Sequence, residues 1–162
     1  MLGQFTPAYN QLYDLDTQKT VFTNALLENN RARAEFLYPS LINAFLSTHQ
    51  FFLPHLQNFL YSLARAIAPT CQLETMLYLC NLNHANQRIL TLTNDQFITL
   101  MKETTDQPTF MYFLATSNLT LQLLAPHLDD MTETKIQAIH NLFEEEQDMQ
   151  PHQRNGFGRR AG

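Results

Sequence analysis

The sequence predicts an all-α fold, a compact multi-helix bundle of about seven or eight short helices. Its 162 residues include 26 leucines against six isoleucines and one valine, and this excess of γ-branched side chains favours helix over sheet. The glycines are Gly3, Gly156, Gly158 and Gly162, so the interior lacks the residue that phosphate-binding loops and nucleophile elbows require. Most common nucleotide-binding enzymes are therefore disfavoured.

Residues 35–69 carry the longest apolar periodicity and organise the rest of the chain. Pro54 stands where the first turn of a helix tolerates a missing N–H, and Pro69 stands where that helix must stop. Pro39 is expected to open a shorter preceding helix, so that the two helices meet at a corner over residues 50–54. The expected apolar faces comprise Leu41, Ile42, Phe45 and Leu46 in the shorter helix, and Leu53, Leu56, Phe59, Leu60, Leu63, Ala66 and Ile67 in the longer one.

One helix is predicted before this pair and another directly after it. Asp14 or Asp16 is expected to cap the first helix by accepting backbone N–H groups. The polar run 28–33 that follows is expected to face outward. Residues 70–82 are predicted as a fourth helix, and the asparagine-rich stretch 81–91 as a loop.

The second half is expected to contain four further helices. Thr93 and Gln96 have the spacing of a capping box, in which side chain and backbone satisfy one another at the start of a helix. Asp106 and Pro108 are expected to start the next helix. Because residues 109–116 are apolar on all sides, that helix is predicted to be central.

Two shorter signals define the remaining helices. Asn118 is expected to begin a short helix that ends before Pro126, and Thr132 is expected to cap the last helix. Three glutamates, 144–146, stand near the end of that helix, where the helix dipole disfavours negative charge. That end is therefore expected to fray or to contact a basic partner.

Composition divides the chain into an N-terminal arm, 1–13, a helical domain, 14–147, and a polar tail with arginine and glycine, 148–162. No repeat with a period of about 20–50 residues is present, so a solenoid is not expected. The net charge is −5, and the three arginines in the last nine residues leave −8 on residues 1–153. A body of that charge does not bind nucleic acid unaided.

Cysteine usage and hydropathy indicate a reduced compartment and no membrane span. Cys71 and Cys80 have no neighbouring ligand residues, and no apolar signal segment precedes them. No apolar run approaches the ~18–20 residues that a membrane span needs. No cofactor is expected.

Histidine and cysteine spacings do not predict a metal site. His49 and His55 are six residues apart, which does not place both imidazoles on one helix face, and the expected corner at Pro54 separates them. Cys71, Cys80 and His84 lack the close pairing of zinc ligands. Structural or surface roles are therefore expected for both sets.

No residue is assigned to catalysis. Ser47 and His49 stand two apart, which on a helix points the side chains in different directions, and no oxyanion hole is evident. Asp129 with Asp130, and the glutamates 144–146, are carboxylate pairs of a kind that serves acid–base chemistry. In a loop and at a helix end, solvated charge is the simpler interpretation.

Two further patterns concern modification and partners. Asn118-Leu119-Thr120 matches the N-glycosylation pattern, but a helix N-cap is the simpler interpretation. The tail residues Arg154, Phe157, Arg159 and Arg160 are the candidate partner contacts. They suit an acidic protein surface, and they suit nucleic-acid phosphates only weakly because three arginines are few.

The run Asn43-Ala44-Phe45-Leu46-Ser47-Thr48 resembles a segment of the adenovirus minor capsid protein IIIa family, the hexon-linking proteins beneath the capsid vertex. Further resembling positions follow in the same order along residues 9–143 and are expected to belong to the core. They are Tyr9-Asn10, Gln18, Arg31, Arg33-Ala34, Asn58-Phe59, Gln96-Phe97, Thr116 to Asn118 and Leu124-Ala125-Pro126. Members of that family are much longer, which weakens the transfer of a penton-binding role to this chain.

The resemblance implies a helical, non-enzymatic cement protein on the inner side of a viral shell. Such a protein links penton base and hexon, takes part in virion assembly, and is located in the virion and the host nucleus. The alternative is a helical adaptor or chaperone-like module, bacterial or host-directed and cytoplasmic, that binds a partner helix in a groove near residues 35–69. The expected partners are other proteins, and an enzyme of unrecognised type is the least favoured interpretation.

Overall fold

The computed structural model describes residues 14–149 and confirms the predicted all-α class. Its elements are, in chain order, α2 (Leu15–Leu27), α3 (Arg31–Thr48), α4 (Phe52–Ile67), α5 (Leu73–Cys80), β1 (Asn83–His84), β2 (Gln87–Arg88), α6 (Asn94–Glu103), α7 (Gln107–Thr116), α8 (Leu121–Leu124), the 3-10 helix η1 (Ala125–Asp130) and α9 (Glu133–Met149). The expected arm, 1–13, and residues 150–162 of the expected tail lie outside the described range.

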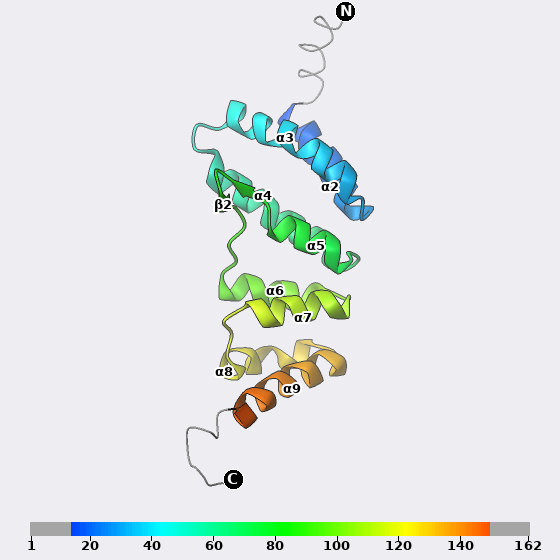
Figure 1. The fold of residues 1–162 in the computed structure, drawn as a ribbon, viewed down its shortest axis with the longest axis vertical. Coiled ribbons are helices and arrows are strands. Elements are labelled where there is room, and N and C mark those ends of the chain that lie inside the picture. Colours follow the sequence, from blue (N-terminus) through cyan, green and yellow to red (C-terminus); the bar gives the residue numbers. More distant parts are fainter. Residues whose placement is uncertain (1–13, 150–162) are drawn as a thin grey trace, which may run out of the picture.

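The helices are stacked in pairs along the long axis of the molecule (Figure 1). The pair α2 and α3 lies at one end, followed by α4 with α5, α6 with α7, and α8 with α9. Helix α4 contacts α2 and α3 on one side and α6 on the other, while α7 bridges α5 and α9. This layered order has no counterpart in a sequence repeat, because the successive helices differ in length and apolar pattern.

A continuous hydrophobic core runs through the stack. Phe22, Phe45, Phe110 and Phe113 are fully buried, and they come from α2, α3 and α7. The core extends to Ile139 of α9, which is also fully buried. Because burial of one such side chain contributes roughly 1.5–3 kcal/mol, these contacts stabilise even helices α5, α6, α7 and α8, which have 8, 10, 10 and 4 residues and are too short to be stable alone.

Pro39 does not open a helix, which corrects the expected boundary. It lies inside α3, which begins at Arg31 with Asn30 as its N-cap. The side-chain oxygen of Asn30 accepts the N–H of Arg33 at 3.1 Å. Buried Ala34, ahead of the proline, joins the apolar face of the helix, so tertiary packing outweighs the hydrogen bond that proline removes.

The turn between α2 and α3 uses asparagine where many proteins use glycine. Asn29 has φ 54°, in the left-handed region, and the N–H of Asn30 donates to the carbonyl of Ala25 at 2.8 Å, as in a Schellman motif. The side-chain oxygen of Asn29 also accepts the N–H of Gln72 at 3.1 Å and the hydroxyl of Thr75 at 2.6 Å. This residue therefore ends α2 and fixes the start of α5.

The stretch predicted as a loop contains a short β-hairpin. Strands β1 and β2 pair antiparallel, with His84 opposite Gln87. Ala85 and Asn86 between them have φ values of 53° and 66°, so both central residues of this two-residue turn are left-handed, as a type I′ hairpin requires. The asparagine content signalled the turn, but two residues per strand are too few for a strand pattern.

Several predicted helix starts are confirmed, and a second one, besides that at Pro39, is wrong. The carboxylate of Asp14 accepts the N–H of Thr17 at 2.8 Å, and Thr93 with Gln96 forms the predicted capping box. Asn118 does not begin a helix. The N-cap of α8 is Thr120, whose hydroxyl accepts the N–H of Leu123 at 3.2 Å. Both residue types cap helices well, so composition did not decide between them.

The remaining caps at the second-half helices agree with the sequence. The carboxylate of Asp106 accepts the N–H of Thr109 at 3.1 Å at the start of α7. The hydroxyl of Thr132 accepts the N–H of Lys135 at 3.3 Å at the start of α9.

Two expected apolar faces are narrower than predicted. The predicted stripe of α4 is buried at Leu56, Leu60, Leu63 and Ile67. Leu53 is 41% exposed because it lies in the first turn, at the corner itself, while Ala66 is exposed and Phe59 is half-buried. Helix α7 lies between α5, α6 and α9, in agreement with the predicted central position, but one of its sides is not covered. Met111 is 38% exposed, because α7 packs against α5, α6 and α9 and leaves its remaining side to solvent.

Candidate interaction surface

The corner between α3 and α4 closes without any side-chain cap on α4. The hydroxyls of Ser47 and Thr48, the last two residues of α3, donate to carbonyls one turn earlier in that helix, at 2.9 and 2.7 Å. His49 then adopts an extended conformation, φ −124° and ψ 126°. Phe51 stands at the N-cap position of α4, where a polar side chain is the usual choice, and makes no capping hydrogen bond.

Aromatic rings hold this corner together. The rings of His49 and His55 are stacked, with centroids 3.8 Å apart and an interplanar angle of 16°. The ring of Phe45 lies 6.2 Å from His49 and 5.7 Å from Phe59. The amine of Lys19 in α2 lies 5.4 Å from the ring centres of both phenylalanines, which is a cation–π geometry.

Protonation of the two histidines disfavours the stacking of their rings. The pKa of His49 is lowered, first by desolvation, and then by the charges of His55 and Lys19. Two imidazolium rings stacked face to face beside an ammonium group would repel one another. The stack is therefore favourable when both rings are neutral.

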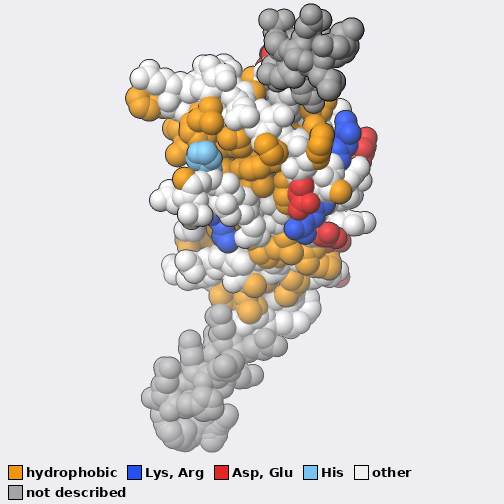
Figure 2. Space-filling model, turned by 45° about the horizontal axis from the view of Figure 1, so that its top comes forward, with side chains coloured by type: hydrophobic (Ala, Val, Ile, Leu, Met, Phe, Trp, Pro, Cys, Tyr) orange, Lys and Arg blue, Asp and Glu red, His pale blue; other side chains and the backbone are white. Residues whose placement is uncertain are grey.

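Large apolar side chains remain exposed around these rings. Leu46 is 47% exposed, Phe51 76% and Leu53 41%, and all three lie within residues 46–53, from the last turn of α3 to the first turn of α4. We call the surface formed by Leu46, Phe51 and Leu53 together with Lys19, His49 and His55 the corner surface. In Figure 2, hydrophobic side chains gather over the upper half of the molecule beside a histidine, and charged side chains of both signs gather to one side of them.

The β-hairpin borders the corner surface. The ring of Phe52 at the start of α4 meets that of His84 edge-on, with centroids 5.1 Å apart. The side-chain amide of Gln57 donates to the carbonyl of Ile89 at 3.1 Å, which fixes the chain after the hairpin to α4. The hairpin is thereby held against the first turns of this helix.

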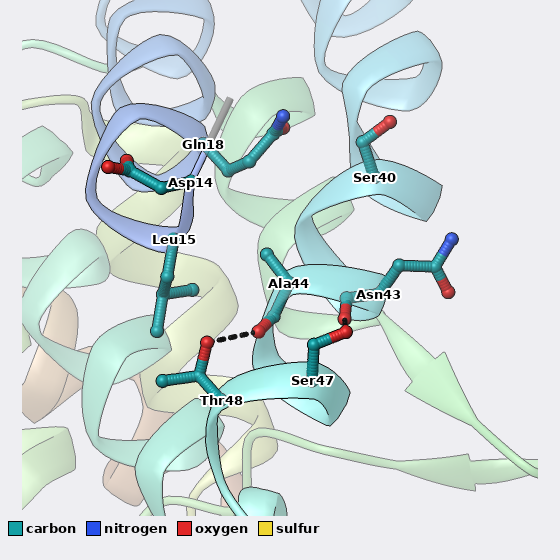
Figure 3. A pocket seen from close by; sticks show the side chains of 8 residues that line it. All are labelled: Asp14, Leu15, Gln18, Ser40, Asn43, Ala44, Ser47 and Thr48. Atoms are coloured by element: carbon teal, nitrogen blue, oxygen red, sulfur yellow. Dashed lines mark hydrogen bonds between the residues drawn. The ribbon is translucent and has the colours of Figure 1, made fainter. Parts of the chain in front are cut away.

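A polar hollow of about 290 Å³ lies between α2 and α3 (Figure 3). It is lined by Asp14, Leu15, Gln18, Ser40, Asn43, Ala44, Ser47 and Thr48. The carboxylate of Asp14 accepts the N–H of Thr17, which lowers its pKa, and the hydroxyls of Ser47 and Thr48 donate to carbonyls of their own helix. The hollow is therefore polar, and the hydroxyl and carboxylate groups named here already form hydrogen bonds at helix ends.

Four of the lining residues belong to the run 43–48 that resembles the capsid protein family. The expectation that the resembling positions belong to the core holds for Phe45, which is fully buried, and fails for Asn43, Leu46 and the two hydroxyl residues, which are exposed. A helix that packs on one side only cannot bury six consecutive residues, because they point in all directions around its axis.

The structure brings the two corner histidines together, although their spacing did not place them on one helix face. His49 lies at the end of α3, and His55 lies in the first turns of α4. The bend between the two helices is therefore what brings the two rings together. Parallel rings do not direct their in-plane nitrogens toward one ion. Among residues 14–149, no group of three or more histidine, cysteine or acidic side chains lies where it could hold a metal ion.

The other candidate groups remain apart or outside the described range. Cys71 and Cys80 are free and buried, and burial raises their pKa values to about 11 and about 12, which keeps both thiols protonated. The hydroxyl of Ser47 donates to Asn43, and no hydrogen bond joins it to His49 within the described part of the chain. The four tail residues, Arg154, Phe157, Arg159 and Arg160, lie outside the described residues.

The acidic candidates are surface charges where the structure describes them. Asp129 and Asp130 are exposed in η1, and the carboxylate of Asp130 lies 3.3 Å from the amine of Lys102. Glu144 is exposed in α9. The side chains of Glu145 and Glu146 lie outside the described set.

A comparison with models of known protein families, with characterised proteins and with solved structures finds no match to this chain. Within residues 14–149, no helix combines the length and the apolar content that crossing a bilayer requires.

Proposed function

We propose that this chain is a non-enzymatic structural protein of a larger assembly, a minor capsid (cement) protein that links major capsid proteins on the inner side of a viral shell. The observation that carries the proposal is the exposure of Phe51, 76%, at a corner that the surrounding helices hold in place. An exposed phenylalanine in a rigid setting suits a contact that buries it, because aromatic anchors dominate the energetics of protein interfaces.

The stacked scaffold supports the same function. The most extensive contacts of the described helices run within a pair or between neighbouring pairs, and the pairs follow one another along the long axis, so each pair has its own outer side (Figure 1). Phe36, on the outer side of α3, is a second aromatic side chain of this kind and is 74% exposed. The capsid assignment itself rests on the resemblance of residues 43–48 and the positions around them.

Fractionation of cells that produce the chain tests this proposal. A cement protein should co-sediment with particles in a density gradient and resist added protease until the particles are disrupted. Phe51→Ser should move the chain to the top of the gradient, whereas Leu123→Ser, which changes a 45% exposed leucine in α8, should not. A chain that never co-sediments with particles contradicts the capsid role.

The adaptor alternative predicts a different behaviour of the isolated chain. An adaptor should elute from a size-exclusion column as a well-behaved monomer or dimer. A cement protein without its neighbours should aggregate, and Phe51→Ser should reduce that aggregation because the exposed ring is removed. A monodisperse wild-type chain that gains nothing from this substitution favours the adaptor.

A further inference from the structure

A small pocket lies where the end of α5, the hairpin, α6 and α7 meet. We propose that this pocket binds a small aromatic carboxylate, a single ring that carries its acid group on a short chain. The pocket has a volume of about 230 Å³. Because drug-sized ligands occupy sites of about 300–1,000 Å³, this volume suits a ligand of about one ring. We call it the aromatic pocket, and the proposal does not depend on the capsid role.

Three aromatic rings form the apolar part of the aromatic pocket. Phe97 comes from α6, whereas Tyr112 and Phe113 come from α7. The rings of Phe97 and Phe113 meet edge-on, with centroids 6.3 Å apart and an interplanar angle of 73°, and the ring of Tyr112 lies 5.6 Å from that of Phe113. Phe113 is fully buried, and the other two rings are partly buried. A flat ligand ring can therefore join this cluster through edge-to-face or offset contacts.

Arg88 places a guanidinium in the lining of the aromatic pocket. It donates to the side-chain oxygen of Asn81 at 2.8 Å, and the side-chain amide of Asn81 donates in turn to the carbonyl of Leu77 at 2.7 Å. Asn81 thereby anchors the guanidinium to the end of α5. No carboxylate within residues 14–149 forms an ion pair with Arg88. Its remaining N–H groups can therefore hold a ligand carboxylate through two parallel hydrogen bonds.

No other group in the described lining of the pocket balances the charge of Arg88. Burial raises the pKa of Cys80 to about 12, and the charge of Arg88 acts in the opposite direction. Desolvation also raises the pKa of Tyr112, again against the charge of Arg88. Both groups are therefore neutral near pH 7. The lining is net positive, unlike that of the polar hollow between α2 and α3, which contains the carboxylate of Asp14.

The acidic residues of the flanking helices do not fill this role. Glu74 of α5 and Glu103 of α6 pair with arginines other than Arg88, and Asp106 caps α7. Asp95, in the first turn of α6, is exposed and does not line the pocket. A ligand carboxylate therefore meets a cation beside an aromatic wall and no acidic side chain among the described lining residues.

Titration of the full chain with 3-phenylpropionate, followed by saturation-transfer difference NMR, tests the inference. The expected Kd is on the order of 0.1–1 mM, as suits a ligand of this size. The neutral analogue 3-phenylpropanamide has the same ring and a similar shape, and it should bind at least about tenfold more weakly because it lacks the charge. The cationic analogue 3-phenylpropylamine should bind more weakly still, because its ammonium group meets the like charge of Arg88.

A pair of arginine variants tests the source of the acid preference. Arg88→Gln should reduce the preference for the acid over the amide to about twofold or less, because the charged partner is removed. Arg33→Gln is the matched control and should keep the full preference. Arg33 is also exposed and has no ion pair within residues 14–149, but it does not line the pocket.

A pair of threonine variants tests the location. Thr116 lines the pocket from the last turn of α7, and Thr116→Phe should weaken binding of the acid at least about tenfold by filling the space. Thr48→Phe should leave binding unchanged. Both threonines are exposed at the end of a helix, and both hydroxyls donate to the carbonyl one turn earlier. Circular dichroism verifies the helix content of each variant, and the arginine pair decides alone if Thr116→Phe does not fold.

Four results overturn the inference. They are equal binding of acid and amide, no binding of the acid at about 10 mM, an acid preference that survives in Arg88→Gln, and undiminished binding to folded Thr116→Phe. A short peptide that ends in phenylalanine offers the same ring and carboxylate on a chain terminus. If that peptide binds more tightly than 3-phenylpropionate, the pocket recognises a protein end and the small-molecule assignment is wrong. Sedimentation with particles does not enter this test, so the two proposals fail separately.

Discussion

The amine of Lys135 donates to the carbonyl oxygen of Met101 at 2.7 Å. It also donates to the carbonyl of Lys102 at 3.1 Å and lies 5.5 Å from the ring centre of Phe110. Lys135 belongs to α9 and both carbonyls belong to the last turn of α6, so one buried ammonium group satisfies acceptors that the end of α6 leaves open. Burial lowers the pKa of this amine. The two hydrogen bonds connect α9, the last helix, to α6.

Lys135→Met should destabilise the protein by about 1–3 kcal/mol, because it keeps the apolar stem of the side chain and removes both hydrogen bonds. Lys102→Met is the matched control. It removes a partly exposed ion pair with Asp130 and should cost at most about 1 kcal/mol. Urea denaturation of the two variants measures the difference, and equal losses would contradict the capping role of Lys135.

Sequence reasoning missed Lys135 because lysine is normally assigned to the surface. A signal was present, since Lys135, Ile139 and Leu142 are spaced four and three residues apart and therefore share the apolar stripe of α9. A lysine on such a stripe either reaches solvent along its apolar stem or is buried and hydrogen-bonds to a buried partner. Which of these applies depends on the end of α6, a helix more than thirty positions earlier in the chain, and local periodicity contains no information about it.

Phe45→Ala should cost about 3–5 kcal/mol, the cost of a large cavity in a packed core, because the ring is fully buried between α2, α3 and α4. Phe59→Ala should cost clearly less. Sequence periodicity placed Phe59 on the buried apolar face of its helix, but its ring is only partly buried against the core. Chemical denaturation of both variants checks this order, and a larger loss at Phe59 would show that the assignment of the core around the corner is wrong.

Asn29 should tolerate replacement poorly, for two separable reasons. Asn29→Gly keeps access to the left-handed backbone conformation but loses the hydrogen bonds to Gln72 and Thr75, which should cost about 1–3 kcal/mol. Asn29→Ala loses the same bonds and adds about 1–2 kcal/mol of backbone strain. Thermal unfolding of the two variants measures each part. A glycine variant as stable as the wild type would show that the side chain contributes nothing.

Ala85→Gly should stabilise the hairpin, because alanine pays a steric cost at φ 53° that glycine avoids. The expected gain is up to about 1 kcal/mol. Ala115→Gly, at an exposed site in the last turn of α7, is the opposite control and should lose up to about 1 kcal/mol. A loss of stability in both variants, measured by urea denaturation, would show that the turn does not strain Ala85.

Periodicity and capping residues predicted the helical class and most helix starts, but they did not predict how the helices meet. Pro39 was assigned to a boundary because proline statistics are local, whereas the apolar face of α3 that continues through it depends on α2 and α4. The corner surface is a similar case. The sequence indicated a corner at residues 50–54, but the stack of His49 on His55 and the exposure of Phe51 follow from the angle at which two helices leave it.

Acidification should weaken the fold through the histidine stack. The pKa of His49 is lowered in the folded protein, whereas an unfolded imidazole titrates near about 6.5. The folded state therefore favours the neutral ring, so its contribution to stability is complete above about pH 6.5 and is lost as the pH falls through the folded pKa. The urea midpoint should decrease between about pH 7.5 and about pH 5, above the range in which Asp14, whose pKa is also lowered, takes up a proton.

His49→Gln should flatten this dependence, because the residue that carries the shifted pKa is removed. His55→Gln should flatten it partly, since desolvation and Lys19 still act on His49. His140→Gln, in α9 and away from the corner, should keep the wild-type slope. If the urea midpoints of all four proteins, the wild type included, decline in parallel over this interval, the acid sensitivity arises elsewhere and the stacked pair does not control it.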